Sequence, residues 1–78
     1  MTPEERVLLF VAEQLVDHPE DVTVTPVEDG RTLTLELRVH EDDVGKVIGK
    51  RGRTAKALRT LVKAASEGGG NVHVEIID

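Results

Sequence analysis

The chain has 78 residues and a formal net charge of −5, a length that allows one small domain. It contains no cysteine, which excludes disulfides and cysteine-based zinc or redox sites. No apolar run approaches the roughly 20 residues that cross a membrane, and the N-terminus lacks the basic start of a signal peptide. We therefore expect a cytoplasmic protein without a membrane span.

The charges are unevenly distributed along the chain. Residues 44–66 contain seven cations and no acid, whereas the remainder contains 3 cations and 15 acids. Local potential steers a ligand more than the net charge does. We expect one basic face on an otherwise acidic domain.

The first predicted element is a helix that begins after Thr2. Thr2 can cap it, Pro3 suits the first helical position, and Glu5 lies three residues beyond the cap. The apolar residues that share one helical face are Val7, Leu8, Val11 and Leu15. The only aromatic residue of the chain, Phe10, is also expected in the core.

The helix should end near Asp17 or His18, because Pro19 disfavours helix at the residue before it. The following segment, residues 22–25, is β-branched throughout and predicts a strand. Pro26 lies inside or just after that strand, which indicates an edge position in the sheet.

A turn and a second strand follow. The Asp-Gly pair within Glu28–Gly30 is a strong hairpin signal. Polar residues then alternate with Leu33, Leu35, Leu37 and Val39, which predicts a strand with one core face and one polar face. The two strands should form an antiparallel hairpin.

Two helices and a third strand complete the chain. The acids at Glu41–Asp43 open a short helix, and a longer amphipathic helix runs from Arg53 to about Ser66. Gly68–Gly70 allows the chain to reverse before a closing strand with apolar residues at alternate positions of 72–76. The inward positions expected on the long helix are Ala55, Leu58, Leu61, Val62 and Ala65. The order α-β-β-α-α-β predicts an α+β fold, a three-stranded sheet with three helices packed on one face.

The tetrapeptide Gly49-Lys50-Arg51-Gly52 carries the clearest chemistry. Its glycines let the backbone approach a ligand closely, and a side chain at either would stand in the way. Backbone amides at a helix N-terminus beside two cations favour an anion, most often a phosphate. The alternative is an ordinary corner between helices with solvated cations. An apolar pair, Val47 and Ile48, precedes the turn and a cation-rich helix follows it, which favours function.

The segment 47–52 matches the signature of KH domains. The runs 44–65 and 72–78 are similar, more closely, to the small bacterial single-KH proteins of the KhpA (YlqC) type. This resemblance implies one type II-like KH domain over residues 1–78, with the GxxG turn at 49–52. The chain departs from the family pattern at Thr54 and Ala55, where aliphatic residues are common. These departures put in doubt the local packing and leave the turn untouched.

The resemblance implies non-enzymatic binding of single-stranded RNA, with the turn clamping the nucleotide backbone. The RNA-binding residues it indicates are Lys46, Val47, Ile48, Gly49, Lys50, Arg51, Gly52, Arg53 and Lys56. An aliphatic strand residue between Leu35 and Val39 would complete the floor of a groove for the bases. Since the chain has no Trp or Tyr, we expect modest affinity, weak sequence preference and strong salt dependence.

The resemblance further implies RNA chaperoning or post-transcriptional control. It implies that the chain forms a homodimer and acts with a multidomain partner of the KhpB (Jag, EloR) type. It also implies a link to cell-wall synthesis and cell length. The exposed part of Leu58, Leu61 and Val62 is a candidate dimer interface. A rival hypothesis is a protein-interaction module whose acidic surface binds a partner and which has no intrinsic RNA binding.

No cofactor, metal or catalytic residue is expected. The three histidines are scattered and show no ligand spacing, at positions His18, His40 and His73. The acids of Glu41–Asp43 are interpreted as a charge cluster at a helix start, and no nucleophile with a positioned base is evident.

Overall fold

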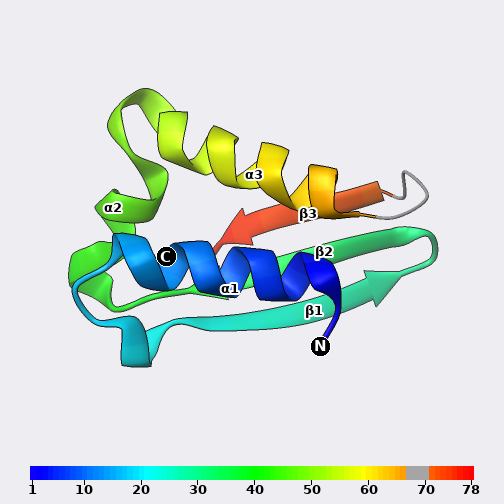
Figure 1. Cartoon of the computed structure of the whole chain (residues 1–78), viewed down its shortest axis with the longest axis horizontal. Helices are drawn as coiled ribbons and strands as arrows, with labels where there is room; N and C mark the ends of the chain where they lie inside the picture. Colours follow the sequence, from blue (N-terminus) through cyan, green and yellow to red (C-terminus); the bar gives the residue numbers. More distant parts are fainter. Residues whose placement is uncertain (67–70) are drawn as a thin grey trace.

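The computed structural model describes residues 1–66 and 71–78, and its elements follow the expected order (Figure 1). The helices and strands are α1 (Pro3–Leu15), β1 (Thr23–Asp29), β2 (Thr32–Arg38), α2 (Val44–Ile48), α3 (Arg53–Ala65) and β3 (Asn71–Ile76). Single 3₁₀ turns occur at Pro19–Asp21, Glu41–Asp43 and Lys50–Gly52. The predicted reversal at Gly68–Gly70 lies outside the described residues. No helix in the described ranges is long and apolar enough to cross a bilayer.

The sheet has the strand order β1-β2-β3. Strands β1 and β2 are antiparallel, which confirms the predicted hairpin, and β3 runs parallel to β2. Pro26 lies within β1, at the edge of the sheet, where its missing amide proton breaks no ladder. Val24 is opposite Leu37, and Leu37 is opposite Ile76, so these side chains point to the same face.

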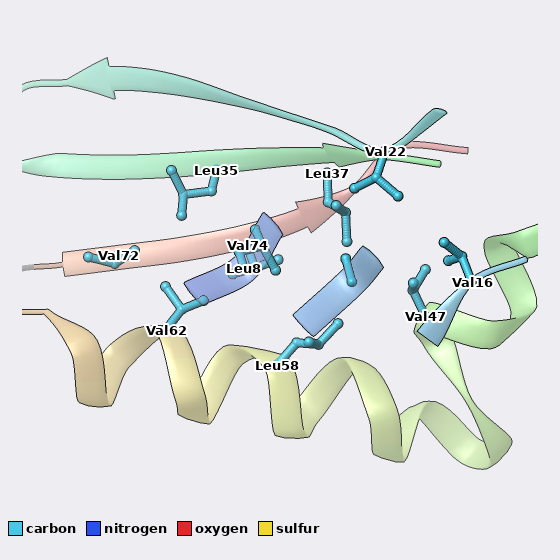
Figure 2. Packing of buried hydrophobic residues seen from close by; sticks show 11 residues of the cluster. Leu8, Val16, Val22, Leu35, Leu37, Val47, Leu58, Val62, Val72 and Val74 are labelled. Carbon is cyan, nitrogen blue, oxygen red and sulfur yellow. The ribbon is translucent and has the colours of Figure 1, made fainter. Parts of the chain in front are cut away.

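The helices lie together on that face and bury one hydrophobic core (Figure 2). The core residues are Leu8, Ala12, Val16, Val22, Leu35, Leu37, Val47, Leu58, Val62, Val72 and Val74. The fold class predicted from the sequence, α+β with a three-stranded sheet and three helices, is therefore confirmed.

The N-terminal cap of α1 forms as predicted. The Thr2 hydroxyl accepts a hydrogen bond from the amide of Glu5 (3.2 Å), and the Glu5 carboxylate accepts one from the amide of Thr2 (3.3 Å). The helix ends at Leu15, before the predicted Asp17 or His18. The backbone turns extended at Val16, whose side chain enters the core, and the amide of His18 donates to the Asp43 carboxylate instead of to a helix carbonyl.

Three predicted core positions are wrong. Phe10 is 63% exposed, Leu61 is 45% exposed and Leu15 is 38% exposed. Because a helix turns by about 100° per residue, Phe10 points about 200° away from the buried Leu8. Leu61 lies beside, and not within, the buried stripe of Leu58 and Val62.

Candidate nucleic-acid interface

Three of the four residues in the turn between α2 and α3 have a positive φ. The φ angles are 76° at Gly49, 58° at Arg51 and 73° at Gly52. The amide of Gly49 donates to the carbonyl of Gly45 (2.8 Å) and closes α2, and the amide of Gly52 donates to the carbonyl of Gly49 (3.2 Å). The helix end, the turn and the second helix start predicted from the sequence are all present.

The two glycines of the turn have different surroundings. A Cβ at Gly49 would lie 2.7 Å from the Cβ and 2.9 Å from the backbone nitrogen of Thr54, so packing inside the protein excludes a side chain there. A Cβ at Gly52 would meet nothing within 4 Å. A side chain at Gly52 would therefore project into open space, and its expected obstruction of a ligand stays a prediction.

Arg51 occupies a backbone conformation that arginine disfavours. Its φ and ψ are 58° and 25°, and it is the only residue other than glycine with positive φ in the described part of the chain. The left-handed region costs a residue with a Cβ about 1–2 kcal/mol. Strained residues of this kind cluster at functional sites, and the side chain of Arg51 is an exposed cation.

Four exposed cations surround the turn, namely Lys50, Arg51, Arg53 and Lys56. Within the described residues, none of them forms an ion pair. Helix α3 begins here with Gly52 as its N-cap, has no side-chain cap and no acid in its first turn. The positive end of a 13-residue helix and four uncompensated cations therefore face the same solvent, an arrangement that suits a polyanion.

Three other predicted site residues have different surroundings. Lys46 forms ion pairs with Asp17 and with Asp43 (3.3 Å to Asp43 Oδ1). Val47 is completely buried and packs into the core near Val16 (Figure 2), so it anchors α2. Ile48, at 39% exposure, remains accessible beside the turn.

Burial narrows the predicted strand floor of a base groove to one residue. Leu35 and Leu37 are both 0% exposed because they point into the centre of the core between the sheet and the helices (Figure 2). Of the stretch from Leu35 to Val39, the apolar residue that keeps partial exposure is Val39.

The structure also reveals a polar cluster at the N-terminal end of α2, which was not predicted from the sequence. The Asp43 carboxylate is 0% exposed and accepts hydrogen bonds from the His18 amide (3.0 Å), from His18 Nδ1 (2.9 Å) and from Lys46 Nζ (3.3 Å). The rings of His18 and His40 stack with their centroids 4.0 Å apart. His40 Nδ1 accepts a hydrogen bond from the amide of Asp42. The one available signal was the spacing of Asp43 and Lys46, which suits an i, i+3 pair.

The contacts within this cluster shift three pKa values. Burial raises the pKa of Asp43, but the hydrogen bonds from His18, the backbone and Lys46 outweigh it and lower that pKa to about 2. The hydrogen bond to Asp43 raises the pKa of His18, and the one to Asp17 raises the pKa of Lys46. Each charged form is therefore stabilised by its neighbours.

Comparison with known proteins places the chain in a family. Residues 5–76 match the family model described as "KhpA/KhpB, KH domain". The chain is 56% identical to the "RNA-binding protein KhpA" of Halalkalibacterium halodurans, over 87% of this chain and 91% of that protein. It is 47% identical to the protein of that name from Bacillus subtilis, over 95% of this chain and 93% of the relative.

Solved structures show the same fold within a larger protein. Aquifex aeolicus Era bound to GDP.AlF4- superimposes with a TM-score of 0.67 at 21% identity, covering 94% of this chain and 29% of Era. A structure of Era in complex with MgGDPNP and nucleotides 1506–1542 of 16S ribosomal RNA gives the same TM-score, with 28% of Era covered. The helices, the glycine turn and the sheet order described above, together with the match over residues 5–76, show that the chain belongs to the KhpA/KhpB KH-domain family.

Proposed function

We propose that this chain binds single-stranded RNA without catalysis, and that the turn Gly49–Gly52 clamps the RNA backbone. The observation that carries the proposal is the group of four exposed, uncompensated cations around the N-terminus of α3. The relatives from Halalkalibacterium halodurans and Bacillus subtilis are named RNA-binding proteins, which agrees with this chemistry.

In the proposed complex the phosphates contact the turn and the first turn of α3. Lys50 and Arg51 supply charge within the turn, and Arg53 and Lys56 extend it along the helix. Ile48 offers apolar surface to a base. Stacking on Trp or Tyr is impossible, since the chain has neither, so counterion release should dominate the affinity and make it salt-dependent.

The sharpest test replaces Gly52 and spares Gly49, because a side chain at Gly49 would clash with Thr54. Aspartate and asparagine have almost the same shape and both tolerate the left-handed region, so Gly52→Asp and Gly52→Asn differ chiefly in charge. Binding of a short fluorescent single-stranded RNA is measured at two salt concentrations, with circular dichroism to verify folding.

We expect Gly52→Asp to weaken RNA binding by about tenfold or more, because it places a like charge beside the phosphates. Gly52→Asn should weaken binding less, because its side chain obstructs the close approach of the RNA backbone without adding a like charge. Wild-type affinity in both variants would contradict the clamp. A folded wild type that binds no RNA in low salt would favour the rival hypothesis, a protein-interaction module with an acidic surface.

We further propose that the chain acts as an RNA chaperone or post-transcriptional regulator in the cytoplasm, with a KhpB-type partner and a link to cell-wall synthesis and cell length. The matched family model describes KH domains of both KhpA and KhpB, so such a partner would carry a domain of the same family. A shallow depression of about 530 Å³ lies on the outer face of α3. Its lining residues are Arg53, Lys56, Ala57, Thr60 and Leu61.

Leu61 is the testable residue of this face, because Leu58 and Val62 are buried and cannot take part in an interface. We propose that a second copy of the chain packs its own α3 against Ala57, Thr60 and Leu61, so that Arg53 and Lys56 stay open to RNA. Leu61→Glu should shift the mass measured by light scattering towards the monomer. Leu15→Glu changes a similarly exposed leucine on α1 and should leave the mass unchanged. The same mass for both variants and the wild type would contradict the α3 interface.

A further inference from the structure

The position of the phosphate-binding turn depends on α2, a helix too short to hold itself. It has five residues, and isolated helices shorter than about 12–15 residues are marginal in water. Its placement must therefore come from tertiary contacts at its two ends. Val47 supplies an apolar anchor by packing into the core (Figure 2).

Asp43 supplies the polar anchor at the start of the helix. Its completely buried carboxylate accepts hydrogen bonds from the amide and the ring of His18, a residue 25 positions away in the loop after α1. No buried side-chain polar atom in the described residues is left without a partner, so this network is complete. A buried carboxylate with complete partners fixes geometry strongly, because leaving any of them unpaired is unfavourable.

Lys46 belongs to this anchor and differs from the cations around the turn. Its ammonium contacts two carboxylates, those of Asp17 and Asp43, whereas Lys50, Arg51, Arg53 and Lys56 contact none in the described residues. The charge of Lys46 is thus already compensated inside the protein. A phosphate would have to compete with both carboxylates for it.

We propose that Asp43, held by His18 and Lys46, is the positioning residue of the phosphate-binding turn, and that Lys46 supports RNA binding through this contact and not by binding phosphate itself. This inference rests on the proposed function. It changes the role of Lys46 from the RNA contact that the family resemblance implies to a support of α2.

The first test compares two neighbouring acids. Asp43→Asn and Asp42→Asn each remove one negative charge, and electrostatics alone would leave RNA binding equal or tighter in both. Asp42 is 74% exposed and serves as the control. If Asp43 positions the turn, Asp43→Asn should instead weaken binding by roughly three- to thirtyfold, the range of coupling through a packed network. Equal binding by the two folded variants would overturn the proposal.

The second test uses the salt dependence of RNA binding. Each phosphate neutralised on a single strand contributes about 0.7 to the slope of log K against log salt concentration. Lys50→Gln should lower that slope by about 0.7, whereas Lys46→Gln should weaken binding and keep the wild-type slope. An equal fall of the slope in both variants would make Lys46 a phosphate contact and overturn its assignment.

The two proposals can fail separately. Wild-type binding together with unchanged affinity in Asp43→Asn and Lys46→Gln would overturn the positioning role alone. A wild type that binds no RNA would overturn the proposed function and this inference with it. If Asp43→Asn does not fold, the salt slopes of Lys46→Gln and Lys50→Gln still decide whether Lys46 supports α2 or binds phosphate. That comparison needs no change at the buried carboxylate of Asp43.

Discussion

Asp43 Oδ2 accepts hydrogen bonds from both the backbone amide (3.0 Å) and the ring Nδ1 (2.9 Å) of His18. This pair joins the loop after α1 to the start of α2, and the GxxG turn follows directly. The contact has a consequence for stability as well as for RNA binding, because the two partners shift each other's pKa in opposite directions.

The stability of the fold should therefore depend on pH through His18. Since its pKa is raised above 6.5 in the folded protein, its contribution is complete below pH 6.5 and is lost as pH rises through the raised value. The pKa of Asp43 is lowered to about 2, so its contribution is complete above its ordinary value near 4 and is lost as pH falls towards 2. Urea unfolding of His18→Gln should show a larger loss of stability at pH 5.5 than at pH 8.5.

The control for this prediction is His73→Gln. His73 is exposed on β3 and pairs with Thr34, on the sheet face away from the helices.

The groups that face His18 are the carboxylate of Asp43, the stacked ring of His40, and the nearby charges of Glu20 and Asp21. A loss of stability in His18→Gln that is the same at both pH values would show that protonation of His18 adds nothing to the ion pair.

Alanine at the two glycines of the turn should destabilise the protein unequally. Both substitutions place a Cβ at positive φ, which costs about 1–2 kcal/mol at Gly52 in the left-handed region (ψ 15°) and about 1–3 kcal/mol at Gly49 (ψ 174°), in a region that is essentially restricted to glycine. Only Gly49→Ala also drives a Cβ into Thr54, and overpacking typically adds about 1–3 kcal/mol. Urea unfolding should rank wild type above Gly52→Ala, and Gly52→Ala above Gly49→Ala. Equal losses would mean that the α2–α3 corner relaxes around Thr54 without strain.

Changing Arg51 should separate stability from RNA binding. Arg51→Asn replaces a strained arginine at φ 58° with a residue that tolerates this region, so the variant should unfold at the same or a higher urea concentration. The same change removes a cation from the turn and should lower the slope of log K against log salt concentration by about 0.7. Reduced stability with unchanged RNA affinity would assign Arg51 a structural role instead.

The sequence predicted the elements of the fold well because their signals are local. The Thr2–Glu5 capping box, the Asp29-Gly30 turn and the alternation along β2 each follow from a few neighbouring residues, and all are present. The glycine turn was predicted for the same reason, since φ preferences act within one or two residues.

The contacts that hold α2 could not be predicted in this way. Asp43 and His18 are 25 positions apart, and no periodicity relates them. A run of acids at Glu41–Asp43 reads as a helix start, because nothing local shows that one carboxylate is buried and two are exposed. The clash that a side chain would make at Gly49 and not at Gly52 was hidden as well, since it depends on how closely Thr54 packs.

Phe10 gives a last prediction, about which face of α1 stabilises the protein. Hydrophobicity alone would assign the only aromatic residue a large role, but it is 63% exposed, whereas Leu8 is 0% exposed. Phe10→Gln should change the free energy of unfolding by only about 0.5 kcal/mol, as for other surface substitutions. Leu8→Ala should cost about 2–5 kcal/mol, because it leaves a cavity in the core. A loss of several kcal/mol in a monomeric Phe10→Gln variant would contradict the placement of α1 on the sheet.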